Sequence, residues 1–278
     1  MAVVRPKRAH TLLAAMWVIA PLALVHDCLA QARYEVVSIH RADPYATSSG
    51  FSDGAQGGIR ARNVTALQAL QFAYAVEDFQ LIDVPNWARS QRFDIAFTPA
   101  ESEGAPQTTS GGASAARWTR QQQRMQAVLR DRFGLVLRQE TREMPVYILT
   151  AAKNGPKLSP AAHPEKLQTV NLNNISGGRR LIVTNVTMSA VADTLTWTLA
   201  RAVQDQTGLV GSYDFRLDWG LDPTPPDAGA NGPALSDTPA LPSIFTALTE
   251  QLGLRLTSGK GPVSVFAVDK IVPPDLDR

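Results

Sequence analysis

The stretch GGIRARNVTALQALQFAY at residues 57–74 has a counterpart later in the chain, GGRRLIVTNVTMSAVADTL at residues 177–195. Both run from a glycine pair through basic and apolar residues to Asn-Val-Thr, and then into a helix-like pattern. In the first copy Leu67, Leu70 and Tyr74 recur at i, i+3 and i+7, which places them on one helical face. The two stretches therefore predict that one strand–helix unit occurs twice.

The two Asn-Val-Thr segments, residues 63–65 and 185–187, match the glycosylation pattern, but three-residue matches often arise by chance. We interpret them as helix entries. The Asn or Thr side chain accepts a hydrogen bond from an unpaired amide in the first helical turn, an interaction worth about 1 kcal/mol. On this interpretation the segments are evidence for a repeated unit, not for a sugar attachment point.

The rest of the chain repeats the same order of elements. Apolar stripes predict one helix that ends near Gly134 and another that begins at Ser243, and each is followed by two strands. The predicted strands outside the opening repeat lie at 34–40, 93–97, 135–140, 145–151, 213–219, 252–256 and 261–268. The expected fold is α+β, an internal duplication whose two similar halves each pack helices on a small, mostly antiparallel sheet.

Composition breaks suggest the domain boundaries. We expect a first half at 33–160, with a Pro-, Gly- and Ser-rich linker near 98–116. We expect a second half at 161–278, with a similar linker near 220–240. The linkers fall at equivalent places, which again favours a duplication.

The N-terminal residues 1–32 have the layout of a secretory signal peptide. A basic start precedes an apolar run from Thr11 to Val25, which Pro21 interrupts, and small residues allow cleavage after Ala30 or Ala32. The apolar run is short against the roughly 20 residues that cross a bilayer. We therefore expect a periplasmic or extracellular protein without a membrane span after cleavage.

The composition argues against several classes of site. Removal of residues 1–32 takes away three basic residues and one acidic residue, so the formal charge of +2 becomes zero, which does not favour nucleic-acid binding. The single Cys and two of the four His leave with this segment, which disfavours a structural zinc site. We expect no metal and no cofactor.

Five charged residues are the candidates for binding a ligand. Arg60 and Arg180 follow the glycine pairs and suit an anion-binding turn, although a plain hairpin turn explains the same pattern. Asp214, Arg216 and Asp218 alternate along one predicted strand, where they either bind a polar ligand or form a solvated outer face.

Nothing in the sequence identifies catalytic residues. The motifs GxSxG, HExxH and GxxxxGK[ST] are missing, and the histidines left as imidazole bases are His40 and His163. Four tryptophans could stack on sugars or peptides, although their alternation with apolar residues favours core positions: Trp87, Trp118, Trp197 and Trp219.

The order of motifs resembles an acidobacterial family of exported, soil-associated proteins of unknown function. The resemblance is carried by ARNVTALQALQFAY, by MQAVLRDRFGLVLRQETREMPVYILT and by VQDQTGLVGSYDFRLDW, and it extends from Tyr34 to Pro274. His40 stands where that family usually has Lys. Related domains occur fused to antibiotic-sensor-type membrane metallopeptidases, which implies a sensing or binding role in the cell envelope. No catalytic residue is carried over.

These observations lead us to expect a non-enzymatic binding, interaction or sensing module of the bacterial cell envelope. Its partner would be an envelope protein or a small polar ligand. The alternative is a secreted hydrolase or carbohydrate-active enzyme, which requires two carboxylates facing each other across a pocket, roughly 5 to 10 Å apart. A third possibility is a scaffold protein, for which an exposed sheet edge would be the sign.

Overall fold

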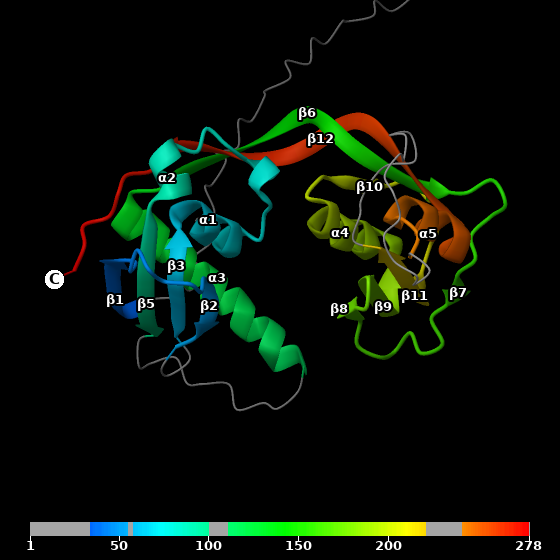
Figure 1. Cartoon of the computed structure of the whole chain (residues 1–278), viewed down its shortest axis with the longest axis horizontal. Helices are drawn as coiled ribbons and strands as arrows, with labels where there is room; N and C mark the ends of the chain where they lie inside the picture. The colour runs from blue at the N-terminus through cyan, green and yellow to red at the C-terminus, as the bar shows by residue number, and fades with distance from the viewer. Residues whose placement is uncertain (1–33, 55–57, 100–110, 221–240, 278) are drawn as a thin grey trace, which may run out of the picture. The chain divides into compact units, whose positions relative to one another are not determined.

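The computed structural model describes residues 34–54, 58–99, 111–220 and 241–277 (Figure 1). The predicted signal segment lies outside these residues, as do nearly all of the linker predicted near 220–240 and positions 100–110 of the other linker. The described residues form helices and mostly antiparallel sheets, which confirms the α+β class. None of the described helices is long and apolar enough to cross a membrane.

The first sheet has the strand order β1-β5-β3-β2, and its neighbouring strands are antiparallel. The elements of this half are β1 (Tyr34–Arg41), β2 (Gly50–Asp53), β3 (Ile59–Thr65), α1 (Ala66–Tyr74), η2 (Asp78–Gln80), β4 (Leu81–Ile82), α2 (Asn86–Ser90), β5 (Arg92–Pro99) and α3 (Gly111–Phe133). Helices α1 and α3 contribute Leu70 and Met125 to a core that also buries Phe93 and Ile95 of β5.

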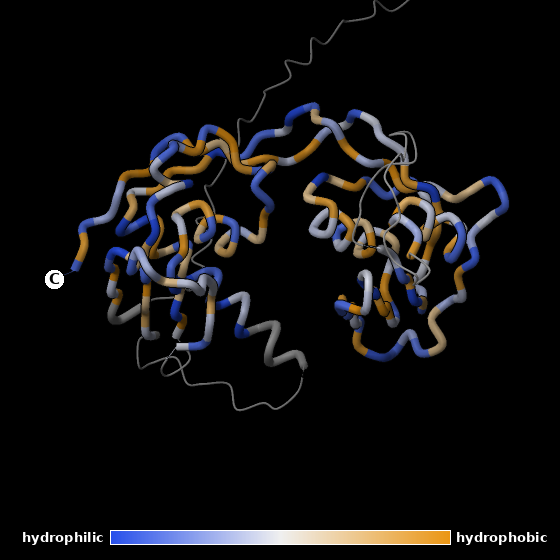
Figure 2. The backbone as a smooth tube through the Cα atoms, in the orientation of Figure 1, coloured by the Kyte–Doolittle hydropathy of each residue, from blue (hydrophilic) through white to orange (hydrophobic). Residues whose placement is uncertain are grey.

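The second sheet has the strand order β7-β11-β9-β8 and is also antiparallel. Its half contains β7 (Ser159–Pro160), β8 (Thr169–Ile175), β9 (Gly178–Thr187), α4 (Met188–Leu199), β10 (Val203–Asp205), β11 (Ser212–Gly220) and α5 (Ile244–Leu252). Residues such as Leu195 and Leu248 of the helices are buried with Leu181 and Leu217 of the strands. Figure 2 shows hydrophobic residues along α4 and α5 and on the strands behind them.

A two-stranded ribbon formed by β6 (Val136–Ala151) and β12 (Leu254–Lys270) is the centre of a third sheet, with the order β10-β6-β12-β4. The prediction of four short strands here was wrong, because each pair of predicted strands is one continuous strand. Pro145 lies inside β6 and Pro262 inside β12. Both lie where neither β10 nor β4 is paired with the ribbon, so a missing N–H removes no bond to a third strand.

The ribbon takes part in both hydrophobic cores. At one end, Val268 is buried in the core of the first half, together with Ile271 just beyond β12, and Leu137 packs against this core. At the other end, Leu149 and Leu254 are buried in the core of the second half. The boundary predicted near residue 160 therefore does not separate two self-contained cores.

Each Asn-Val-Thr segment forms a β-bulge followed by a helix N-cap. Asn63 and Asn185 have positive φ, 50° and 56°, and each backbone N–H donates to an aspartate on the neighbouring strand, Asp94 or Asp214, at 2.7 Å. This backbone conformation suits Asn better than most residues. The insertion shifts the register of both strand pairs.

The threonine of each segment caps the following helix as predicted, because Thr65 accepts from the N–H of Gln68 and Thr187 from that of Ala190. The asparagine, the other candidate for the cap, has a different role. The Asn185 side-chain amide instead donates to the carbonyls of Pro164 and Lys166 and so holds a loop. Equivalent bonds join Asn63 to Ala46 and Ser48. The duplication stays a prediction, which these matching contacts favour.

The C-terminal tail covers the outer edge of β1. The backbone N–H of Asp277 donates to the carbonyl of Ile39 at 2.9 Å, and the Ile39 N–H donates to the Asp277 carboxylate at 2.7 Å. Arg132 of α3 donates to the same carboxylate at 3.1 Å. These two bonds, that of Ile39 first and that of Arg132 second, lower the pKa of Asp277. The tail is thereby tied to both the sheet and a helix.

We expect Asn185→Ala to destabilise the protein more than Asn185→Gly. Both replacements remove the side-chain bonds to the loop, at a cost of about 1–2 kcal/mol. Alanine adds a further penalty of roughly 1–2 kcal/mol because it disfavours the left-handed conformation that glycine adopts freely. Urea unfolding at neutral pH measures both values. Equal losses for the two variants would contradict a role for the positive φ.

Replacing Asp277 with asparagine should lower the melting temperature at pH 7. A carboxylate whose folded-state pKa is lowered stabilises the fold above its unfolded-state pKa, and this stabilisation disappears as the pH falls through the folded-state value. The difference between wild type and Asp277→Asn should therefore shrink as the pH falls below about 4. Thermal melts from pH 7 to pH 2 test this, and a difference independent of pH would refute it.

Candidate functional site

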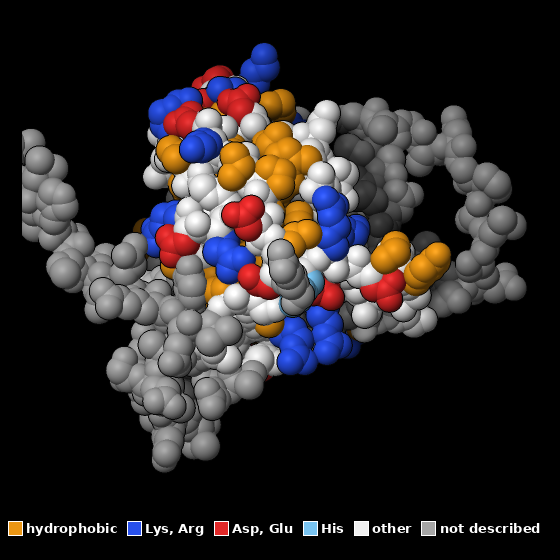
Figure 3. Space-filling model, turned by 90° about the vertical axis from the view of Figure 1, so that its left-hand side faces the viewer, with side chains coloured by type: hydrophobic (Ala, Val, Ile, Leu, Met, Phe, Trp, Pro, Cys, Tyr) orange, Lys and Arg blue, Asp and Glu red, His pale blue; other side chains and the backbone are white. Residues whose placement is uncertain are grey.

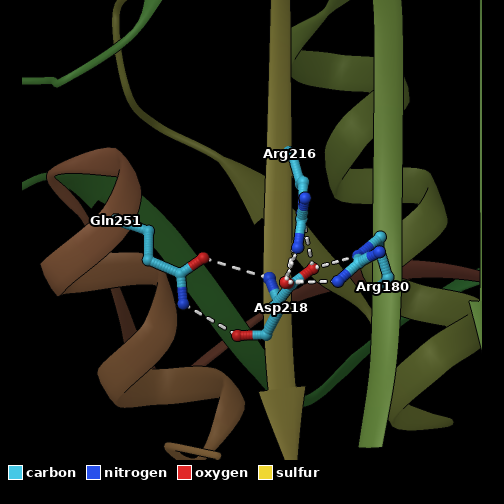
Figure 4. Close-up of polar contacts among 4 residues, drawn as sticks. All are labelled: Arg180, Arg216, Asp218 and Gln251. Carbon is cyan, nitrogen blue, oxygen red and sulfur yellow. Dashed lines mark hydrogen bonds and ion pairs between the residues drawn. The ribbon is translucent and has the colours of Figure 1, made fainter. Parts of the chain in front are cut away.

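Three of the five predicted ligand-binding residues meet on the outer face of the second sheet. Asp218 of β11 accepts from Arg180 of β9, from Nε at 2.8 Å and Nη2 at 3.1 Å, and also from the Arg216 side chain two residues earlier (Figure 4). Bonds from Arg216 and then Arg180 hold the pKa of Asp218 well below its usual range, against the opposing effect of desolvation. The carboxylate is therefore ionised and occupied by two guanidinium groups.

Gln251 of α5 holds the backbone of the same residue. Its side-chain oxygen accepts from the N–H of Asp218 at 3.0 Å, and its nitrogen donates to the carbonyl of Asp218 at 2.8 Å (Figure 4). The amide therefore pairs with β11 as a neighbouring strand would. This arrangement joins α5 to the sheet. Both carboxylate oxygens and both backbone polar groups of Asp218 are therefore bonded within the protein.

The remaining two predicted residues lie elsewhere. Asp214 closes the bulge at Asn185, and its pKa is lowered by the N–H of Ala162 first and by that of Asn185 second. Arg60 is exposed on β3 of the first sheet, opposite Ala96. The structure therefore brings Arg180, Arg216 and Asp218 together and does not bring all five into one site.

The two histidines outside the signal segment are both exposed. His40 Nε2 lies 2.8 Å from the Ser38 hydroxyl, and its Nδ1 lies 3.1 Å from the carbonyl of Asp277. Because that carbonyl only accepts, Nδ1 donates, and the ring anchors the C-terminal tail. His163 pairs with Glu165 at 3.2 Å. On the face of the molecule in Figure 3, basic and acidic side chains are interspersed.

An open pocket with an aromatic lining is the candidate binding site that sequence reasoning missed. Its volume is about 610 Å³, and β2, α1 and α3 supply most of its wall. The rings of Phe51 and Phe72 stack with centroids 4.3 Å apart, and Trp118 meets Phe72 edge-on at 5.8 Å. Trp197 of α4 also lines it. Trp118 and Trp197 remain 44% and 50% exposed, so their rings are available for contact.

The polar groups of this pocket are uncharged. Three glutamine side chains line it, and none of the described lining residues is an Asp, Glu, Lys, Arg or His. The polar lining residues are Ser49, Gln68, Gln71 and Gln122. Such a surface offers ring faces for stacking and amides for hydrogen bonds, but it offers no group that titrates near neutral pH.

The other two tryptophans, Trp87 and Trp219, lie in or against a hydrophobic core, as predicted. Trp219 is 4% exposed in the core of the second half, and Trp87 packs against the core of the first half. The alternation of strand residues correctly placed Trp219 inside. No comparable sequence pattern predicted that Trp118 would be exposed, because its exposure depends on which face of α3 the sheet leaves uncovered.

We expect Asp218→Asn to lower stability. The replacement keeps the size of the side chain but removes the charge that pairs two arginines, so the loss should be about 1 kcal/mol, or roughly 2–4 °C in melting temperature. Asp193→Asn on the exposed surface of α4 is the matched control. Identical melting temperatures for the two variants would show that the cluster contributes nothing to stability.

Comparison with known proteins assigns a family but no activity. No curated protein and no solved structure matches the chain. A family model described as "Protein of unknown function (DUF3738)" matches residues 67–271, from the first turn of α1 to the residue after β12. This match covers the second sheet and the ribbon, and of the first sheet it includes β5. It spans more than half of the chain, which therefore belongs to the DUF3738 family of proteins of unknown function.

Proposed function

We propose that this protein is an exported, non-enzymatic binding module of the bacterial cell envelope, and that its aromatic pocket takes a small, neutral sugar. The observation that carries the proposal is the lining of the pocket, which combines exposed aromatic rings with uncharged amides. Pockets of roughly 300–1,000 Å³ are typical of small-molecule sites.

The chemistry of the lining favours a neutral ring over a charged ligand. A carboxylate or phosphate would lose its water in the pocket without gaining a cationic partner from the described lining residues. The C–H face of a sugar ring can stack on the exposed faces of Trp118 and Trp197. Its hydroxyls can both donate to and accept from amides such as that of Gln122.

The same lining favours binding over hydrolysis. General acid–base catalysis needs a group that gains or loses a proton within hydrogen-bond reach of the substrate. A carboxylate mechanism needs two such groups across the pocket, and the described lining residues include none. The alternative of a carboxylate hydrolase therefore has no support at this pocket.

The proposed location rests on the N-terminal sequence. Residues 1–32 have the basic, apolar and small-residue segments of a secretory signal, and the resemblance to exported acidobacterial proteins agrees with them. Cell fractionation of the native host, followed by N-terminal sequencing, tests this part separately. A mature protein that begins after Ala30 or Ala32 is the expected result.

To identify the ligand, the protein is screened on a glycan array of neutral sugars. We expect at least one sugar to bind and, in solution, to shift the tryptophan fluorescence of the protein. Trp118→Ala should weaken its binding at least fivefold in calorimetry, since loss of stacking costs roughly 1–3 kcal/mol. Trp118→Phe keeps a ring and should retain most of the affinity.

The control is Tyr45→Ala, which removes an aromatic ring that is 88% exposed and does not line the pocket. This variant should bind like the wild type. Equal binding by Trp118→Ala, Tyr45→Ala and the wild type would exclude this pocket. Turnover of the bound sugar would contradict the non-enzymatic role.

A further inference from the structure

Strand β8 is an exposed edge of the second sheet. It pairs with β9 along its whole length, and the strand order places no described strand on its other side (Figure 1). Six of its seven residues are exposed. Two of them are apolar, Val170 at 41% and Leu172 at 43% exposure, and Leu167 just before the strand is 70% exposed.

Two other strands at the borders of the first and second sheets are covered, in contrast to β8. The tail at Asp277 covers β1 in the first sheet, and β7 together with Gln251 covers β11 in the second. Proteins usually protect long edges with charges, prolines or bulges, since unpaired backbone groups recruit further strands. Residues 167–175, LQTVNLNNI, contain no charged residue and no proline, and no register shift interrupts β8.

The order of apolar and polar residues along this edge is palindromic. Read from Leu167 to Ile175, the residues are apolar, polar, polar, apolar, polar, apolar, polar, polar and apolar, and the reversed order is identical. Asn171 is the central residue. In an antiparallel pair related by a two-fold axis, residues whose numbers are equally far from the centre lie opposite each other on the same face.

We propose that β8 pairs antiparallel with β8 of a second copy of this chain, about a two-fold axis at Asn171. In this register Val170 lies opposite Leu172 of the other copy, and Leu167 lies opposite its Ile175. The polar residues also pair with each other, Thr169 with Asn173 and Asn171 with its own counterpart. Each exposed apolar side chain thereby gains an apolar neighbour.

The pairing is possible without electrostatic cost. Because none of the nine residues is charged, two identical edges approach without repulsion, and the backbone groups at the free edge gain partners. The second sheets of the two copies become one continuous sheet across the axis. This is an isologous contact, the commonest kind in homodimers.

A charge test separates this pairing from any other association. Asn171→Asp places two carboxylates opposite each other, whereas Asn174→Asp adds the same charge opposite the neutral Gln168 of the other copy. In sedimentation equilibrium the wild type should be a concentration-dependent dimer. Asn171→Asp should raise the dissociation constant of the dimer at least tenfold, and Asn174→Asp should change it much less. Circular dichroism confirms that both variants are folded.

A disulfide test determines the register. All variants carry Cys28→Ser, which removes the single natural cysteine. Asn171→Cys should form an oxidised dimer, because the two Cα atoms lie about 4.5–5.5 Å apart in such a pair. Thr169→Cys and Asn173→Cys should each stay monomeric under oxidation, since their own counterparts lie about 13 Å away. A mixture of these two variants should form a cross-linked heterodimer.

The proposal is wrong if the wild-type protein is monomeric at high concentration. It is also wrong if Asn171→Asp leaves the dimer intact and Asn171→Cys does not cross-link it. Neither outcome concerns the sugar pocket, because no residue of β8 lines it. Asn171→Asp should bind the sugar of the proposed function as the wild type does.

Discussion

The structure depends on one antiparallel pairing, that of β6 with β12. The two strands are far apart in the sequence, yet they remain paired from Val136 opposite Lys270 at one end to Ala151 opposite Leu254 at the other, with one register shift after Val268. Each end of this ribbon supplies buried side chains to a different core. The helices of each half therefore pack not only on their own sheet but also on strands that the two halves share. A sequence boundary between the halves does not correspond to a boundary in packing.

Local sequence predicted the local elements well. The spacing of Leu67, Leu70 and Tyr74 indicated α1, and Thr65 and Ser243 were identifiable as caps because their side chains act within one helical turn. The long ribbon strands were not predictable in the same way. Proline usually interrupts a strand, and whether a third strand needs its N–H depends on neighbours distant in sequence.

The candidate site was even less predictable from local sequence. Alternating charges correctly placed Arg216 and Asp218 on an outer strand face, but the pattern does not show that Arg180 and Gln251 would bond to Asp218. The aromatic pocket has no local signature at all. Phe51, Phe72 and Trp118 belong to three elements, and their contact arises only when α1 and α3 meet beside β2.

The shared ribbon also has a consequence for the order of folding. During synthesis the residues of the first half emerge long before Val268 and Ile271, which its core requires. Neither β6 nor the helices of the first half can reach their final packing until nearly the whole chain is available. Contacts this distant in sequence slow the search for the folded state. Late completion of the core would favour the proposed export if the chain crosses the membrane unfolded.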